Sequence, residues 1–185
     1  MEEKKENNSN ANIKSIGPMG SFRYEGEQKT KNFDDVNNLT NLLDYKIVKI
    51  EVWTADHFNP SSVLNGIETT YQNLRTGELV TSGCRVSEMN LIGTTVFEFQ
   101  EGEYIVNLNI RSGWVMDCLT LYLNSGRKFS IGGTGGDPTF FKLDNQVVVG
   151  FFGSSGTSLY NLGVHTITTE EYHENIKNHS LNSGL

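Results

Sequence analysis

Cysteine is scarce in this 185-residue chain, which contains Cys84 and Cys118 alone. Two cysteines so far apart in the sequence exclude a disulfide scaffold and a zinc site, because both need more ligands at closer spacing. We therefore expect free, buried thiols. Long apolar runs are also missing: no stretch reaches the ~18 apolar residues that a membrane-spanning helix requires.

Basic residues are outnumbered as well. The 15 Lys and Arg against 22 Asp and Glu give a net charge of -7 and a pI near 5.1. Nucleic acid and anionic membranes are thereby excluded as main partners, because binding to phosphate needs clustered positive charge. Residues 1–10 lack the apolar segment of a secretory signal, so we expect a cytoplasmic protein.

Patterns typical of enzymes are absent too. Residues 153–156 do not match the Gly-x-Ser-x-Gly spacing of a nucleophile elbow, and residues 132–137 lack the lysine of a phosphate-binding loop. The four histidines, which we expect mostly at the surface, have no metal-ligand spacing: His57, His165, His173 and His179. The sequence therefore predicts no catalytic activity, no metal and no cofactor.

What the chain does contain is short strands. Apolar residues alternate with polar ones over 48–52, 106–110 and 119–123, a period of two that predicts strands with one buried face. Glycine, asparagine and serine separate these segments, which is typical of all-β proteins. The buried positions predicted from this pattern are Val48, Ile50, Val106, Leu108, Ile110, Leu119, Leu121, Val148 and Phe151.

A weak internal repeat accompanies the strands. Residues 45–52 resemble residues 104–111, a second strand follows each of these segments, and residues 147–162 form a third copy. Units of this size cannot bury a core alone, so the three copies must pack on one another.

Four segments carry a family resemblance: Gly17-Pro18-Met19-Gly20, residues 102–105, residues 124–129 and residues 149–153. In type and order they resemble the jacalin-related (mannose-type) lectins. Over about residues 16–167 the resemblance implies an all-β fold, a β-prism of three four-stranded antiparallel sheets with a pseudo-threefold repeat.

The resemblance also implies where a sugar would bind. In the family a Gly-x-x-x-Asp loop, completed by a glycine-rich loop elsewhere, holds the sugar. The second repeat keeps this motif, which makes the best candidate site, and we expect it to face Gly83: Gly113, Trp114, Val115, Met116 and Asp117. The last repeat has lost its carboxylate and is expected to face Gly20: Gly156, Thr157, Ser158 and Tyr160. In the first repeat Asn65 replaces the carboxylate, and we expect it to face Gly135 and Gly136.

The two ends lie outside the predicted prism. Residues 1–15 are polar and predict a disordered arm. In the tail, residues 168–185, Thr168 and Glu171 form a capping-box pattern that predicts a short helix to about Asn175. Tyr172 and Ile176 would share one face of that helix and offer an anchor for a protein partner.

Two functions remain open at this point. The first is a carbohydrate-binding module with a degenerate site for a mannose-type glycan. The alternative is a non-catalytic structural or interaction subunit of a larger assembly, which keeps the lectin fold without sugar binding and holds protein partners through its termini.

Overall fold

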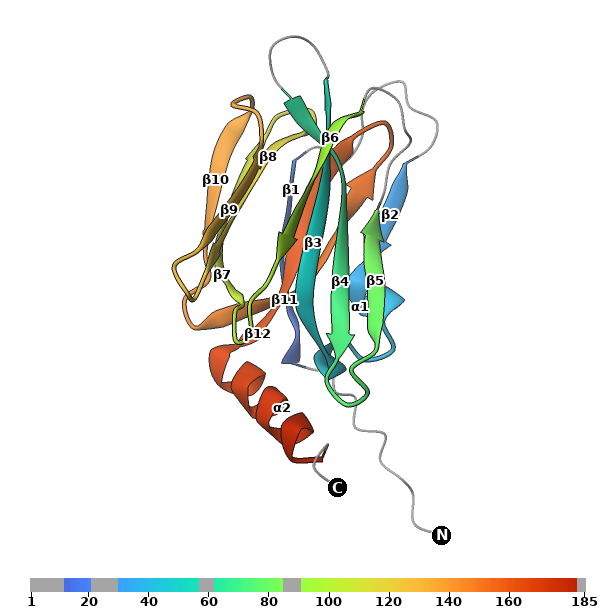
Figure 1. Ribbon diagram of the computed structural model, residues 1–185. Coiled ribbons are helices and arrows are strands. Elements are labelled where there is room, and N and C mark those ends of the chain that lie inside the picture. Colours follow the sequence, from blue (N-terminus) through green and yellow to red (C-terminus); the bar gives the residue numbers. More distant parts are fainter. Residues whose placement is uncertain (1–11, 21–29, 57–61, 85–90, 183–185) are drawn as a thin grey trace.

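The chain forms a prism of three antiparallel sheets, four strands each (Figure 1). The computed structural model describes residues 12–20, 30–56, 62–84 and 91–182. The first sheet, ordered β5-β4-β3-β6, contains β3 (Tyr45–Asp56), β4 (Ser62–Asn73), β5 (Leu79–Cys84) and β6 (Leu91–Glu98). The second, ordered β10-β7-β8-β9, contains β7 (Ile105–Ser112), β8 (Met116–Leu123), β9 (Lys128–Gly132) and β10 (Asp137–Lys142). The third, ordered β1-β12-β11-β2, contains β1 (Lys14–Gly20), β2 (Lys31–Asp34), β11 (Gln146–Ser155) and β12 (Leu159–Thr168). The predicted β-prism is confirmed.

The inner faces of the sheets meet in one core. Ile50, Leu108, Leu121, Phe151 and Leu162 are among the side chains that are almost completely buried there. Each fully buried side chain of this size contributes roughly 1.5–3 kcal/mol. The small size of each sheet is therefore offset by a core that all three share.

The predicted core needs a correction at two positions, Val48 and Val106, which are only half-buried. Each is the extra residue of a β-bulge, because the pairing of β3 with β4 shifts across Val48 and that of β7 with β8 shifts across Val106. A bulge moves the alternation by one residue, so Ile47 and Ile105 take the buried places instead.

A buried carboxylate links two of the sheets. Asp35 begins the short helix α1 (Asp35–Asn38), which the Asp34 side chain caps at the Val36 N–H (3.0 Å). Asp35 accepts hydrogen bonds from the Tyr71 hydroxyl on β4, from Ser82 Oγ on β5 (2.5 Å) and from the Phe151 N–H on β11 (2.8 Å). Burial raises the pKa of Asp35, and these donors act in the opposite direction. The 3₁₀ helix η2 (Leu42–Asp44) then leads into β3.

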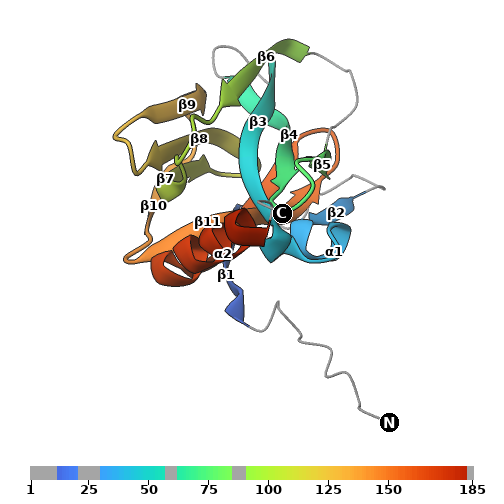
Figure 2. The same ribbon diagram turned by 60° about the horizontal axis from the view of Figure 1, so that its bottom comes forward.

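The C-terminal helix α2 (Thr169–Asn182) closes one end of the prism, as Figure 2 shows from below. The predicted capping box is present: Glu171 Oε2 accepts from Thr168, and the Glu171 N–H donates to Thr168 Oγ1 (3.2 Å). The helix continues past Asn175, whose side chain donates to the Leu43 carbonyl (3.2 Å), and His179 Nε2 lies 3.1 Å from Asp44 Oδ1. It is therefore longer than predicted because η2 supports its second half.

The predicted partner-binding face of this helix is used within the chain. Tyr172 packs against the core, its ring centre 5.2 Å from that of Tyr104. Burial raises the pKa of the Tyr172 hydroxyl to about 12. The Tyr172 face therefore packs in part on the prism itself, with Tyr172 and Ile176 half-buried, and a protein partner at this face stays a prediction. Of the predicted disordered arm, residues 1–11 lie outside the described residues, whereas Lys14 and Ser15 begin β1 and pair with Thr166 and His165 of β12.

Candidate functional site

Three equivalent bulges mark the end of the prism away from α2. The strand pairings shift across Asn65 in β4, across Asp117 in β8 and across Tyr160 in β12. The sheets are oriented by their other ends: β12 runs into α2, and Tyr104, just before β7, contacts Tyr172 of α2. The predicted register of the three repeats is thus present in the structure, and the three candidate residues occupy matching positions.

The loops that lead to two of these bulges have the same internal geometry. The Gly113 N–H donates to the Val115 carbonyl at 3.0 Å, and the Gly156 N–H donates to the Ser158 carbonyl at 3.0 Å. In both loops the bulge residue lies two positions after the residue whose carbonyl accepts this bond. The side chains at the two bulges can therefore be compared directly, Asp117 in one loop and Tyr160 in the other.

The Asp117 carboxylate lies against a glycine loop. The Gly133 N–H donates to the Asp117 carbonyl (2.8 Å), and a Cβ placed on Gly135 would collide with Asp117 Oδ1. A Cβ on Gly136 would collide with the other carboxylate oxygen. Only residues without side chains allow the loop backbone to approach this closely.

This arrangement corrects two predicted pairings. The sequence predicts that Asp117 faces Gly83 and that Asn65 faces Gly135 and Gly136. In the structure the glycine loop after β9 lies against Asp117 instead. The physical reason is sheet connectivity: β9 pairs with β8, while Gly83 lies on β5 in another sheet. Each bulge is therefore matched by the edge strand of its own sheet.

Strand register also shows that Gly83 is out of position. Gly132 pairs with Cys118, directly after the Asp117 bulge, and Gly20 pairs with Asn161, directly after the Tyr160 bulge. Both have φ near +110°, and a Cβ on either would collide with the carbonyl oxygen of the bulge residue. Gly83 pairs with Glu68, two residues beyond the matching Gly66. The matching position is residue 85, outside the described residues.

Exposure separates the three bulge residues. Asn65 and Tyr160 have 0 % exposed surface, whereas Asp117 keeps 9 %. The Tyr160 hydroxyl accepts from the Thr157 N–H (3.2 Å) within its own loop. Because a side chain without exposed surface cannot touch a ligand, the first and last repeats offer no side-chain acceptor at this position.

The remaining predicted residues of the second loop divide between surface and core. Trp114 is 78 % exposed, beside the Asp117 loop, and Gly113 is exposed. Met116 is completely buried, so it contributes only backbone to the loop. Val115 is half-buried and gives its carbonyl to the Gly113 N–H. In the last loop Thr157 is exposed, whereas Ser158 is buried.

Sequence reasoning missed Arg111 of β7. Its guanidinium donates from Nε to the Gly135 carbonyl (2.9 Å) and from Nη2 to the Gly136 carbonyl (2.8 Å). In the sequence Arg111 is the last residue of an alternating strand, which favours a solvent-facing role. Arg111 pairs with Pro138 on the neighbouring strand β10, which leads back to the glycine loop. That Arg111 lies near this loop can be seen only from the order of the strands in the sheet.

The charge state of Asp117 follows from its surroundings. Burial raises the pKa of Asp117, while the positive charge of Arg111 and the Gly113 N–H lower it. The carboxylate and the guanidinium together carry no net charge. The site therefore presents strong hydrogen-bond acceptors without a large electrostatic field.

No metal-binding group of histidine, cysteine and acidic residues occurs in the described part of the chain. Cys118 is a half-buried free thiol. The expectation of surface histidines is wrong for His165 and His179, which are buried. His165 lies within hydrogen-bonding distance of Asp34 and Ser15, and His57 lies outside the described residues. None of the described helices has the length and apolar character needed to cross a membrane.

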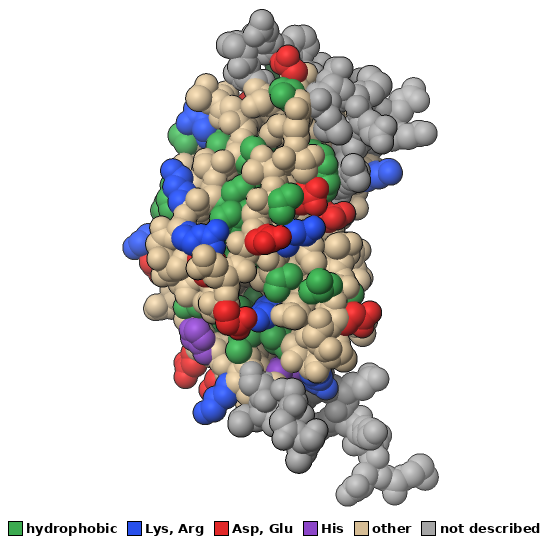
Figure 3. Space-filling model, in the orientation of Figure 1, with side chains coloured by type: hydrophobic (Ala, Val, Ile, Leu, Met, Phe, Trp, Pro, Cys, Tyr) green, Lys and Arg blue, Asp and Glu red, His purple; other side chains and the backbone are tan. Residues whose placement is uncertain are grey.

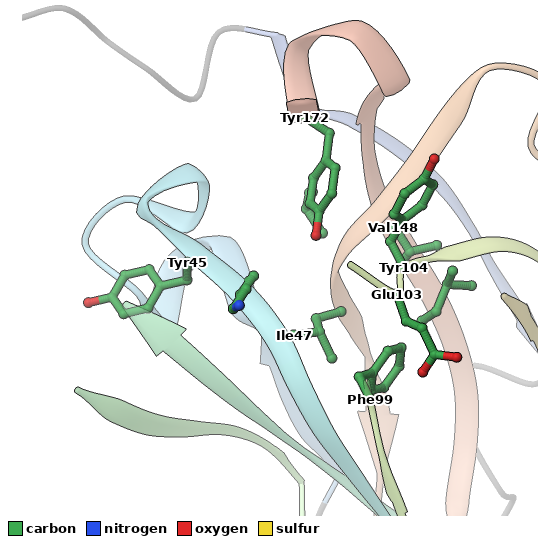
Figure 4. A pocket seen from close by; sticks show the side chains of 10 residues that line it. Tyr45, Ile47, Phe99, Glu103, Tyr104, Val148 and Tyr172 are labelled. Atoms are coloured by element: carbon green, nitrogen blue, oxygen red, sulfur yellow. The ribbon is translucent and has the colours of Figure 1, made fainter. Parts of the chain in front are cut away.

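Two pockets lie at the α2 end, far from Asp117. One crevice of about 10 Å³ is lined by Ile47, Phe99, Glu103, Tyr104 and Tyr172, and Figure 4 shows the Glu103 carboxylate pointing away from the other side chains. This volume is about that of one water site. The adjoining open pocket measures about 120 Å³, below the roughly 300 Å³ at which ligand sites begin. Neither of these two pockets has the volume of a typical ligand site.

Comparison with known proteins agrees with this fold. The family model described as Jacalin-like lectin domain matches residues 16–165. A search of curated proteins finds no match. Among solved structures, wild-type Malaysian banana lectin is 19% identical, with 84% of this chain and 99% of that chain covered and a TM-score of 0.63. Calystegia sepium agglutinin is 18% identical, with 84% and 96% covered and a TM-score of 0.64. Artocarpin complexed with Me-alpha-mannose is 17% identical, with 85% and 99% covered and a TM-score of 0.64. At these identities the likeness shows the fold.

Proposed function

Because the chain belongs to the Jacalin-like lectin domain family, we propose that it binds a carbohydrate through the 113–117 loop and the glycine loop 133–136. One observation carries the proposal: among the three equivalent bulge residues, Asp117 alone combines a carboxylate with exposed surface. That carboxylate lies directly against the backbone of Gly135 and Gly136.

The chemistry of a neutral sugar fits these groups. A carboxylate accepts hydrogen bonds from two adjacent hydroxyls, and charge-assisted bonds are roughly twice as strong as neutral ones. In the proposed binding mode, backbone N–H groups of the glycine loop donate to sugar oxygens. Trp114 offers an exposed ring on which the C–H face of a sugar can pack. Because Arg111 balances the charge of Asp117, the site favours neutral over acidic sugars.

Mannose-type glycans are the proposed substrate class. Artocarpin is described in complex with mannotriose and with Me-alpha-mannose, and Calsepa lectin in complex with a biantennary N-glycan. These proteins share the fold, and the sequence resemblance points to the same mannose type. We therefore propose one working site on a prism that has three positions for such a site.

An alternative function has one observation in its favour. Two of the three bulge positions hold buried, uncharged side chains, Asn65 and Tyr160, so most of the sugar-binding capacity of the fold has been replaced by core. A protein that keeps the prism only as an interaction subunit would show this pattern. It would also show no loss of function when Asp117 is changed.

The test is isothermal calorimetry with methyl α-mannoside, preceded by a glycan array to find the best ligand. Asp117→Ala removes the charged acceptor, which is worth about 1.5–3 kcal/mol, so affinity should fall about tenfold or more. Asp144→Ala, which removes an exposed acid 3.1 Å from Lys142 Nζ, is the matched control and should bind as the unchanged protein does.

Two results would contradict the proposal. If the unchanged protein binds no glycan on the array, the result favours the alternative function as an interaction subunit. If it binds but Asp117→Ala binds equally well, the sugar lies elsewhere on the prism.

A further inference from the structure

Arg111 holds the glycine loop at two adjacent points. Its planar guanidinium donates to the Gly135 carbonyl at 2.9 Å and to the Gly136 carbonyl at 2.8 Å. These are the same two residues against which the Asp117 carboxylate lies. A fork of two donors fixes direction as well as distance, which a lysine ammonium cannot do.

The loop needs such support. Residues 132–136 include four glycines, and glycine loses more conformational freedom on ordering than any other residue. Residues 132, 134 and 136 are exposed, so little packing restrains the loop. Without the Arg111 contacts the Gly135 and Gly136 backbone would be free to move away from Asp117.

At the strand position of Arg111 the other two repeats hold residues of other types. Arg111 pairs with Cys118, the residue after the Asp117 bulge. The matching residue in the last repeat is Ser154, which pairs with Asn161. In the first repeat it is Trp53, which pairs with Gly66. Ser154 Oγ is buried and has no hydrogen bond within the described residues. The guanidinium thus occurs in the one repeat that keeps the carboxylate.

We infer that Arg111 is a positioning residue for the sugar site: it holds the glycine loop in its binding geometry and places its positive charge near the Asp117 carboxylate. This inference rests on the proposed function of the 113–117 loop. It adds a residue on the strand before the loop, outside the Gly-x-x-x-Asp motif.

The test compares Arg111→Met, which removes the fork and the charge, with Arg111→Lys, which restores the charge alone. Affinity for methyl α-mannoside at pH 7 should fall about tenfold with methionine, because two charge-assisted hydrogen bonds that order the loop are lost. Lysine should recover only part of this loss. Arg75→Met, an exposed arginine paired with Asp44 at the α2 end, is the control and should change nothing.

The pH profile separates the two roles. Protonation of Asp117 removes the charged acceptor, so affinity is lost as the pH falls through the pKa of that carboxyl. Because the charge of Arg111 lowers the pKa of Asp117, Arg111→Met should move the midpoint of this loss to higher pH. Arg111→Lys should return the midpoint close to that of the unchanged protein while its affinity at pH 7 stays weaker.

Amide hydrogen exchange provides a readout without sugar. Exchange at residues 133–136 should become faster in Arg111→Met and remain slow in Arg75→Met. Unchanged exchange together with unchanged affinity would overturn the inference. If the unchanged protein binds no sugar at all, the proposed function fails, but faster exchange in Arg111→Met would still establish that Arg111 holds the loop.

Discussion

The loops 113–117 and 156–160 have matching internal hydrogen bonds and end in different chemistry. Each closes with a 3.0 Å bond from its first N–H to its third carbonyl, and each ends in a β-bulge. In the first, Asp117 stays partly exposed beside Gly135 and Gly136. In the second, Tyr160 is fully buried and its hydroxyl accepts from the Thr157 N–H.

The difference shows that the bulge position can serve either a ligand or the core. The Asp117 carboxylate keeps a small exposed surface beside the glycine loop, and the positive charge of Arg111 lies nearby. A phenol at the same position packs in the protein interior instead, because its ring adds buried apolar surface and its hydroxyl accepts a hydrogen bond from a loop N–H. In the last repeat the bulge residue thus contributes apolar burial and a hydrogen bond within its own loop, where the second repeat has a carboxylate.

The largest expected effect is on stability, from Tyr160→Ala. Removing a fully buried aromatic side chain should lower the free energy of unfolding by about 3–5 kcal/mol, through lost burial and the cavity left behind. Urea denaturation measures this change. Sugar affinity of the folded fraction should stay unchanged, because the Asp117 site belongs to another sheet. A stability loss below about 1 kcal/mol would show that Tyr160 is not part of the core.

A smaller effect is expected on binding, from Gly135→Ala. The new Cβ would collide with Asp117 Oδ1, so either the carboxylate or the loop must move. Affinity for methyl α-mannoside should fall about tenfold, close to the effect of losing the charged acceptor. Gly93→Ala is the matched control, because a Cβ there meets nothing within 4 Å and leaves the site untouched. Equal affinity of the two variants would refute the close approach of the loop to Asp117.

Much of this fold follows from local patterns in the sequence. Period-two strands and a threefold repeat predicted an all-β fold of three units that share a core, and the resemblance to the jacalin-related lectins implied that these units form a prism. Which strand residues face the core was harder to predict from the sequence. Val48 and Val106 are displaced by bulges, and an extra residue in a strand leaves no mark in the alternation until its pairing partner is known.

The candidate site was predictable in its first half only. The Gly113–Asp117 motif is contiguous in the chain, so the sequence reveals it. Its partner loop and Arg111 reach Asp117 through sheet order, β10 beside β7 and β9 beside β8. The same long-range information was missing for the tail, where the Tyr172 face looked free in the sequence but packs on the prism.

The smallest effect tests the hydroxyl that distinguishes the two loops. Tyr160→Phe keeps the buried ring and removes the acceptor of the Thr157 N–H. The loss should be about 0.5–1.5 kcal/mol of unfolding free energy, the usual net contribution of a neutral hydrogen bond. Because Thr157 is exposed, water can replace part of that bond, which favours the lower end of this range. Amide exchange of Thr157 should become faster, whereas the affinity for sugar should not change. If Tyr160→Phe were as unstable as Tyr160→Ala, the hydroxyl rather than the ring would hold the loop, and the last repeat would be a polar site instead of core.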